Sequence, residues 1–323
     1  MCRPRQLQNI ALNNHLQMKT AYIIPGALAL SLLLSLPGVA QSRWYWGTEF
    51  SGGIAAAVTM KGGSTDRASI CDEFINPQYA SVPGCTDPNP GSNSAFRTEF
   101  ESAVGVLGNL SLGYEALSWL RLEVEYAAWH AQYDEAAFVA TASGDALDKL
   151  SQEIFLAREW LGAFSSSGGF VNAYLDYKPV ARTFGVYAGA GGGLATAAAG
   201  YTSLWVRNKD VDAILTGVGQ PNEDEIRQNL AGTFSNGQAT LRSVTPVVQL
   251  LFGVDRYLTD RLSVGLKARY VMYLDFQSEG DLVWDPLRSH VPNNRRDGSE
   301  PVHGIYGADF SAVTFGLQVK RRY

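Results

Sequence analysis

The stretch Leu262–Phe276, LSVGLKARYVMYLDF, decides the fold class. Every second residue in it is apolar or aromatic, and the residues between include Lys267, Arg269 and Asp275. Side chains alternate across a β-strand, so the pattern predicts one strand with an apolar face and a polar face. The stretch is longer than a tilted strand needs to cross a bilayer.

The same alternation recurs along the rest of the chain, which predicts eight strands in all. The seven further stretches are Trp44–Val58, Val104–Tyr114, Leu120–His130, Val171–Tyr177, Phe184–Leu194, Val244–Val254 and Ser311–Tyr323.

Short and long connections alternate strictly between these strands. The short ones are Glu115–Trp119, Lys178–Arg182 and Tyr257–Arg261. The long ones cover about 59–99, 134–167, 205–239 and 278–305. Outer-membrane barrels have this asymmetry of tight periplasmic turns and long extracellular loops, whereas soluble domains rarely hold four such loops. Both chain ends are then expected on the side of the short turns.

Alternation alone does not separate this fold from a soluble β-sandwich or a lipocalin-like barrel. The polar face favours a narrow lumen because it carries Gly185, Tyr187, Gly189 and Gly191 beside its charges. Aromatic residues near strand ends fit interfacial girdles. They are Trp44, Trp46, Tyr114, Trp119, Tyr177, Tyr257, Tyr270, Tyr273 and Phe276. The prediction is an all-β, eight-stranded, antiparallel up-and-down transmembrane barrel with four long extracellular loops.

The first forty residues have the features of a signal peptide. From a plausible start at Met18 they run through Lys19, an apolar run over 21–36 and a small-residue end, Gly38-Val39-Ala40. We predict a signal peptide over 1–40 and the barrel over 41–323. A membrane anchor is the alternative, disfavoured because prolines interrupt the short apolar run.

The charge and the cysteines fit an exported protein. Residues 1–40 contribute three basic residues and no acidic one to the net charge of −5, so residues 41–323 carry −8. An acidic chain argues against nucleic acid as a partner. Cys71 and Cys85 lie close together in a loop-like stretch, and a disulfide is the natural interpretation in an oxidising compartment, with two free thiols as the alternative.

Three stretches resemble a known family. Val171–Tyr177 is followed after a short turn by Gly185–Gly191, Phe252–Val264 forms a strand-turn-strand, and the chain ends in an aromatic residue, Tyr323. The sequence resembles the opacity-protein and surface-antigen group of small outer-membrane barrels. It departs from that group at Arg321, where members often have a hydrophobic or aromatic residue. The resemblance implies a surface-exposed barrel whose loops make contacts, and it implies no catalytic residue.

The candidate site is the set of charges at lumen positions of the strands. They are Glu49, Arg121, Glu123, Glu125, Asp176, Asp255, Lys267, Arg269 and Asp275, with Lys320 on the last strand. The interior of an eight-stranded barrel is just wide enough for side chains to fill. Charges there must pair or stay hydrated, so they form either a salt-bridged plug or the lining of a narrow gated pore.

The second long loop contains the one helical signal, at Asp145–Trp160. Such a helix would pack on the loops or rim, or would bind a partner at the cell surface. The histidines of the barrel, His130, His290 and His303, have neither metal-ligand spacing nor a serine in a nucleophile-elbow context. Gly189–Gly193 lacks the end of a phosphate-binding glycine motif. We expect no catalytic, cofactor-binding or metal-binding residue and no cofactor.

Two functions follow as expectations. The first is a surface-exposed structural or interaction protein, adhesin- or antigen-like, that acts through its long loops. The alternative is a small porin with a narrow charged lumen. Expected partners are the outer-membrane lipid and a host or cell-surface ligand, and the barrel is expected to be a monomer in the cell outer membrane.

Overall fold

The structure is a computed structural model that describes residues 43–64, 69–72, 75–86, 94–136, 140–141, 152–177, 183–279, 283–284 and 305–323. The predicted signal peptide lies outside the described residues and stays a prediction. Residues Arg43–Arg322 form one unit.

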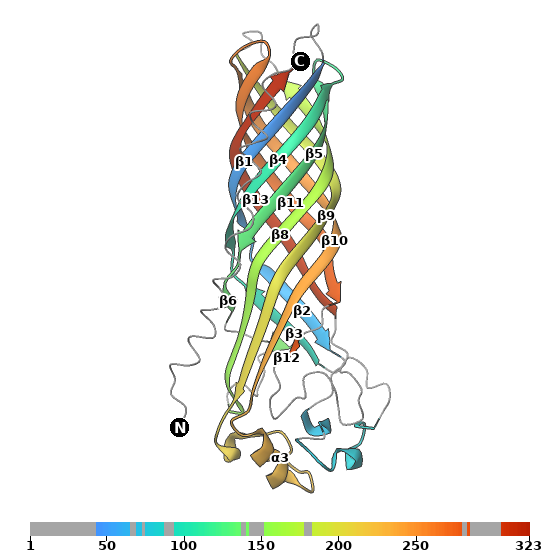
Figure 1. The fold of residues 1–323 in the computed structure, drawn as a ribbon, viewed down its shortest axis with the longest axis vertical. Helices are drawn as coiled ribbons and strands as arrows, with labels where there is room; N and C mark the ends of the chain where they lie inside the picture. Colours follow the sequence, from blue (N-terminus) through green and yellow to red (C-terminus); the bar gives the residue numbers. More distant parts are fainter. Residues whose placement is uncertain are drawn as a thin grey trace. The chain divides into compact units, whose positions relative to one another are not determined.

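Eight long strands close into a ring, and this confirms the predicted fold class (Figure 1). Each strand pairs antiparallel with the next, and the last pairs with the first. Their order around the ring follows the chain, which makes an up-and-down barrel. The strands are β1 (Trp44–Ala55), β4 (Ala103–Glu115), β5 (Leu120–Gln132), β8 (Ile154–Tyr177), β9 (Phe184–Arg207), β10 (Phe234–Tyr257), β11 (Leu262–Glu279) and β13 (Ile305–Arg322).

Both ends of the ring's chain lie beside the short turns. Tyr45 pairs with Arg322, so β1 begins where β13 ends. The turns 116–119 and 258–261 are at this same end (Figure 1). The four longer connections are at the opposite end, which we call the distal end.

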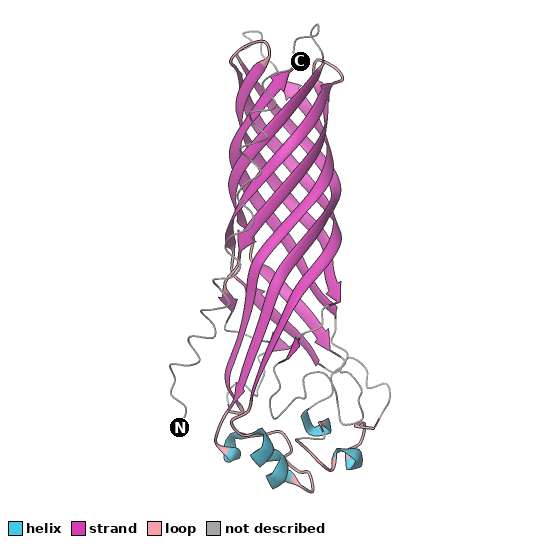
Figure 2. Ribbon diagram, in the orientation of Figure 1, coloured by secondary structure: helices cyan, strands magenta, loops and turns pink. Residues whose placement is uncertain are grey.

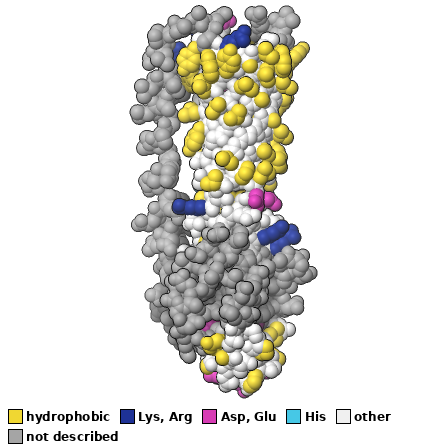
Figure 3. Space-filling model, turned by 90° about the vertical axis from the view of Figure 1, so that its right-hand side faces the viewer, with side chains coloured by type: hydrophobic (Ala, Val, Ile, Leu, Met, Phe, Trp, Pro, Cys, Tyr) yellow, Lys and Arg dark blue, Asp and Glu magenta, His cyan; other side chains and the backbone are white. Residues whose placement is uncertain are grey.

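The outer face of the ring near the short turns is apolar. Phe50, Val104 and Phe315 are 71%, 76% and 66% exposed, although they are hydrophobic. Figure 3 shows hydrophobic side chains covering this part of the surface. Inward positions of the same strands carry charges such as Glu49. Only a bilayer makes this arrangement stable, because hydrocarbon accepts the apolar face and the closed ring satisfies the backbone.

The height of this apolar belt matches a membrane. On β5 the outward residues from Leu120 to Ala128 are apolar, and the next outward residue is the exposed His130. Ten residues at about 3.3 Å each, tilted by about 40°, rise about 25 Å, which is the height of the apolar band of such barrels. His130 therefore lies at the distal rim of the belt.

Three strands extend far beyond the belt. β8, β9 and β10 have 24 residues each, more than twice the number needed to cross a bilayer. Ser165 pairs with Ala198, and Ala198 pairs with Arg242, inside stretches that the sequence pattern assigned to loops or left unassigned. The predicted loops 134–167, 205–239 and 278–305 are therefore too long, although all four distal connections remain the longer ones.

The pattern fails there because the polarity of the sheet reverses outside the belt. Phe164, Ala197 and Tyr201 point inward and are buried, while Ser165 and Thr196 point outward and are exposed. Water surrounds this part of the barrel, so it is built like a soluble barrel, with its apolar side chains inside. Small and polar outward residues then resemble a loop in sequence.

Short strands and helices complete the distal end (Figure 2). β2 (Val58–Ser64) pairs with β13 and with β3 (Ser94–Phe100), within the predicted loop 59–99. The predicted first strand, Trp44–Val58, is too long, because β1 ends at Ala55 and the buried Val58 begins β2. The remaining elements are β6 (Glu135–Ala136), β7 (Ala140–Thr141), β12 (Val283–Trp284), η1 (Ser69–Cys71), η2 (Tyr79–Ser81), η4 (Val211–Ala213) and α3 (Glu223–Leu230).

The predicted helix over 145–160 is wrong where the structure describes it, because Ile154–Trp160 belongs to β8. Pairing with β9 is irregular between Ile154 and Leu156, so Ile154 and Ala157 both face inward three residues apart. Residues 145–151 lie outside the described part.

No helix among the described residues is long and apolar enough to cross a membrane.

We expect folding to depend on detergent or lipid, because the belt residues have no other cover. The folded barrel should migrate differently from the boiled protein on a semi-native gel, and dilution into plain buffer should abolish the folded band. A stable folded monomer without detergent would contradict the membrane assignment.

Candidate functional site: lumen and distal lobe

Six strands bring charged side chains into the lumen near the short turns. These side chains are almost entirely buried, with Arg269 only 2% exposed. The residues are Glu49, Arg121, Glu123, Glu125, Asp176, Asp255, Lys267, Arg269 and Lys320. We call them the charged layer.

Arg269 lies at the centre of the charged layer. Its Nη2 donates to Glu49 Oε2 at 2.7 Å, and its Nη1 donates to Gln249 Oε1 at 2.5 Å and to Glu125 Oε1. Lys267 Nζ lies 3.2 Å from Glu49 Oε2 and 3.5 Å from Glu125 Oε2. Two carboxylates therefore share two cations across the lumen.

Amide side chains satisfy the remaining carboxylate oxygens. Asn109 Nδ2 donates to Glu49 Oε2 at 2.8 Å, and Asn172 Nδ2 donates to Glu125 Oε2 at 3.0 Å. A buried ion pair offsets its desolvation cost only when such additional hydrogen bonds complete it. The polar network is thus built to stay buried.

Glu123 is held mainly by hydroxyl groups. Tyr45 and Tyr174 each donate a hydrogen bond of 2.8 Å to one of its carboxylate oxygens. Lys267 Nζ lies 4.0 Å away. The sequence has Glu123 and Glu125 at lumen positions of one strand and Lys267 and Arg269 at lumen positions of another, and the structure brings these four residues together.

A second group of charges lies nearer the short-turn mouth. Arg121 lies 3.3 Å from Asp176 and 4.0 Å from Asp255, with its guanidinium 4.8 Å from the ring centroid of Tyr187. Lys320 Nζ donates to Asp255 Oδ2 at 2.5 Å. Every charge of the layer thus has an opposite charge within 4.0 Å.

Asp275 does not belong to this layer, so its predicted place in the lumen is wrong. A β-bulge shifts the register between Tyr273 and Phe276, and Asp275 adopts a positive φ of 55°. The extra residue turns Asp275 outward, where it is exposed, and turns Phe276 inward. Phe276 is therefore a lumen residue, and Tyr273 is one as well because it shares the inward parity of Arg269, so neither belongs to the predicted aromatic girdle.

A second, apolar layer fills the lumen distal to the charges. Phe164 stacks on Phe310 with ring centroids 4.1 Å apart, and Tyr273 contacts Phe164 edge-on at 5.2 Å. Phe276 lies edge-on to Phe310 at 5.1 Å. The sequence analysis missed this layer because most of these aromatic residues come from predicted loops or from the bulged end of β11. Alternate apolar residues such as Ala195, Ala197 and Ala199 were the available signal.

The ring of strands is closed, its outer belt is apolar and its lumen is charged. The chain is an eight-stranded transmembrane β-barrel.

Comparison with solved structures finds small outer-membrane barrels at low identity. Neisserial surface protein A is 13% identical, with 87% of this chain and 98% of that chain covered and a TM-score of 0.34. OprG of Pseudomonas aeruginosa is 8% identical over 88% and 98%, with a TM-score of 0.40. Ail of Yersinia pestis is 6% identical over 85% and 98%, with a TM-score of 0.28. No family model and no curated protein matches the sequence.

Two distal segments pack into a small lobe with its own apolar core. Ile75 from the first connection is fully buried against Ile214, Ile226 and Leu230 from the third. We call the described residues 69–72, 75–86 and 208–233 the distal lobe. Asn229 Nδ2 donates to the carbonyl oxygen of Ile75 at 3.0 Å, so polar contacts also join the two segments.

One buried carboxylate anchors this lobe to the barrel. Glu153 has no exposed surface, and it accepts hydrogen bonds from the backbone N–H groups of Leu215 and Thr216 at 3.1 and 2.9 Å. Its other oxygen lies 3.3 Å from Arg207 Nε, at the end of β9. Burial, opposed by the Glu153 charge, lowers the pKa of Arg207.

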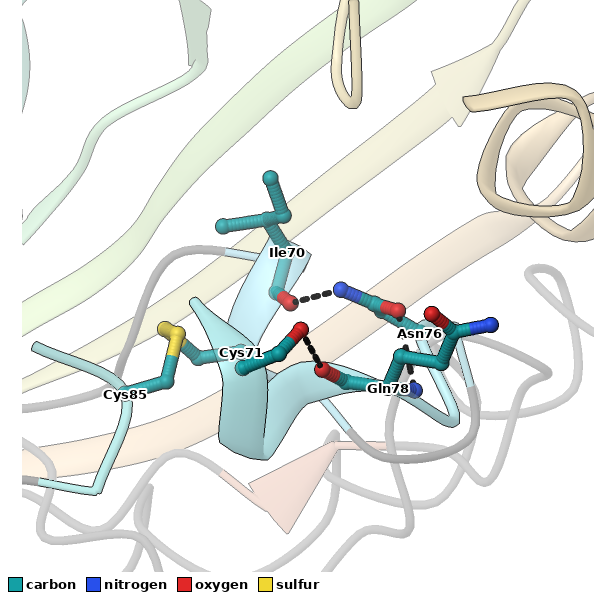
Figure 4. The surroundings of a disulfide bond; sticks show 6 residues. Ile70, Cys71, Asn76, Gln78 and Cys85 are labelled. Atoms are coloured by element: carbon teal, nitrogen blue, oxygen red, sulfur yellow. Dashed lines mark hydrogen bonds between the residues drawn. A yellow bond between two sulfur atoms is a disulfide. The ribbon is translucent and has the colours of Figure 1, made fainter. Parts of the chain in front are cut away.

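A disulfide joins Cys71 and Cys85 in the lobe (Figure 4). Asn76 lies inside the closed loop, donating from Nδ2 to the carbonyl oxygen of Ile70 at 3.0 Å and accepting from the N–H of Gln78 at 3.1 Å. The bridge therefore closes a loop that already has internal hydrogen bonds.

Replacing both Cys71 and Cys85 with serine should loosen the lobe and leave the barrel intact. A loop of this length contributes about 3 kcal/mol in the loop-entropy model. Limited proteolysis should then cut the lobe of the variant faster, while its heat-modifiable gel shift is retained. Two labelled thiols in unreduced, denatured wild-type barrel would rule the bridge out.

Glu159 gives the distal walls a pH dependence. It is 1% exposed on β8 beyond the belt, and Thr98 Oγ1 of β3 donates to it at 2.5 Å. Burial raises the pKa of Glu159, and hydrogen bonds from Thr98, Tyr201 and Ser203 oppose this only in part.

An acid whose pKa is higher in the folded state binds protons more tightly there, so stability should rise as the pH falls from neutral toward the ordinary glutamate pKa. Urea unfolding across this pH range should show the rise in wild type and a smaller one in Glu159→Gln; equal slopes would contradict it.

Among the described residues, no group of three His, Cys, Asp or Glu side chains is placed to hold a metal. His130 is on the outer surface with Nδ1 2.8 Å from Ser165 Oγ, and His290 and His303 lie outside the described residues.

Proposed function

We propose that this barrel resides in the bacterial outer membrane, with its short turns in the periplasm, and acts at the cell surface as an interaction protein. The distal lobe carries the proposal. It has a disulfide, four fully buried apolar side chains and a buried carboxylate anchor, Glu153. A pre-ordered surface loses less conformational entropy on binding than a flexible loop does.

The resemblance to the opacity-protein and surface-antigen group supports an adhesin- or antigen-like role. The proposal involves no catalytic step and no cofactor, and the barrel acts as a monomer whose partners are membrane lipid and a host or cell-surface ligand. The alternative of a small porin loses support because the charged and apolar layers occupy the lumen in series.

Removal of part of the lobe tests this function. Arg207 N–H donates to the carbonyl oxygen of Thr233, so residues 208–232 can be replaced by Asn-Gly, a two-residue hairpin turn. Bacteria that express wild type should attach to cultured epithelial cells or to one another, and the shortened variant should not. The variant must keep its heat-modifiable band and its surface level. Equal attachment by a well-folded variant, or steady ion conductance of wild type in planar bilayers, would contradict the proposal.

A further inference from the structure

The outer face of the sheet changes its chemistry along one row of paired residues. His130 on β5 pairs with Ser165 on β8, Ser165 with Ala198 on β9, and Ala198 with Arg242 on β10. His130, Ser165 and Arg242 are exposed and Ala198 is half-buried. We call these four residues the rim row, because His130 lies at the distal rim of the apolar belt.

Polar side chains flank the rim row on both sides. Thr196 is exposed one step toward the belt, and Gln132 and Thr240 are exposed one step beyond. Figure 3 shows a few basic side chains and some acidic ones below the hydrophobic belt, on a surface that is otherwise mostly neither hydrophobic nor charged. Hydroxyl and amide groups therefore line the first part of the wall outside the hydrocarbon.

The rim row has a positive charge that no carboxylate of the described residues neutralises. Arg242 forms no ion pair within 4.0 Å there, and its backbone N–H donates to Ser278 Oγ at 2.9 Å. Because Nδ1 of His130 lies against Ser165, its Nε2 is the ring nitrogen left for another partner. Cationic and neutral donors thus occur together on one face.

The row crosses the headgroup region obliquely. Neighbouring strands are about 4.8 Å apart, so three strand spacings place the backbones of His130 and Arg242 about 14 Å apart. His130 is ten residues from the first residue of β5, whereas Arg242 is fifteen residues from the last residue of β10, Tyr257. Arg242 is therefore farther from the periplasmic end and lies above the hydrocarbon.

We infer that the rim row binds the phosphorylated saccharide headgroup of an outer-leaflet glycolipid. Arg242 pairs with a phosphate, and His130, Ser165 and Thr196 bond to sugar hydroxyls, while the acyl chains lie along the adjoining belt. The inference rests on the proposed placement in the outer membrane. The row continues directly from the lipid-facing belt, so a lipid fits it better than a soluble ligand does. A simple phospholipid has a phosphate for Arg242 but no sugar for the hydroxyl groups.

Lipid A in nanodiscs of phosphatidylethanolamine is the probe. Folded wild type should retain lipid A in native mass spectra, and Arg242→Gln should lower the association constant about ten-fold, as expected for one hydrogen bond to a charged group. Arg256→Gln is the matched control, because Arg256 is also an exposed arginine of β10 but lies near the opposite end of the strand. Dephosphorylated lipid A should bind wild type no better than lipid A binds the Arg242 variant.

The outcomes separate this inference from the proposed function. A barrel that fails to fold in the nanodiscs contradicts the membrane placement. A folded barrel that binds lipid A equally with and without Arg242, or that exchanges lipid A for phosphatidylglycerol at equal concentration, overturns the rim row as a glycolipid site and leaves the surface function standing.

Discussion

Arg269→Ala should lower the free energy of unfolding by about 3–5 kcal/mol, because it leaves two buried carboxylates without their main partner. Arg269 contacts Glu49, Glu125 and Gln249, and Lys267 alone remains to neutralise both acids. The measurement is the urea midpoint of the heat-modifiable band in detergent micelles.

Arg242→Ala is the control for that experiment, since it removes an exposed arginine and should change the midpoint little. The charge swap Glu125→Arg with Arg269→Glu should recover part of the loss, because these two side chains contact directly. Glu123→Lys with Arg269→Glu should recover less, since Glu123 bonds to Tyr45 and Tyr174 instead. An Arg269→Ala variant as stable as wild type would show that the charged layer does not support the barrel.

Phe164→Ala should destabilise the barrel by about 3–5 kcal/mol, the usual cost of removing a buried phenylalanine. Phe164 is 1% exposed and contacts the rings of Phe310, Tyr273 and Phe276. Phe155→Ala is the matched control, because Phe155 is 76% exposed on the same strand. Equal urea midpoints for the two variants would contradict a packed apolar layer.

The two layers lie in series, so neither single variant should conduct ions. Of these variants, only the double variant, Arg269→Ala with Phe164→Ala, removes side chains from both layers. Planar bilayer recordings should therefore show channels for the double variant and none for either single variant. Conductance in Arg269→Ala alone would show that the apolar layer is permeable.

Sequence alone predicted the membrane-spanning part of this molecule well, because lipid enforces strict alternation there. Strands at Leu120 and Leu262 begin where the pattern places them, and Glu49 and Lys267 point into the lumen. Which charges contact depends on register and barrel shear, which alternation does not encode. The contact of Arg269 with Glu49 and Glu125 therefore required coordinates.

Beyond the belt the sequence signal was weaker for a physical reason. Outward positions such as Ser165 and Gly200 need no apolar side chain there, so the sequence of these long strands resembles that of loops. The bulge at Asp275 adds one residue and inverts every later position, which no periodic pattern anticipates. The core of the distal lobe joins Ile75 to Ile226 across 151 positions of chain, and only tertiary structure reveals such pairs.

The reversal of sheet polarity at the rim row fixes the depth of the barrel in the bilayer and the height of the distal lobe above it. Sinking by two residues would carry His130 and Ser165 into hydrocarbon, and rising by two would bring the apolar residues at the other rim into water. Beyond the rim row, β8 continues from Ser165 to Ile154. These eleven residues rise about 28 Å at the same tilt. The lobe is therefore held at a fixed height above the hydrocarbon by the walls of the barrel itself.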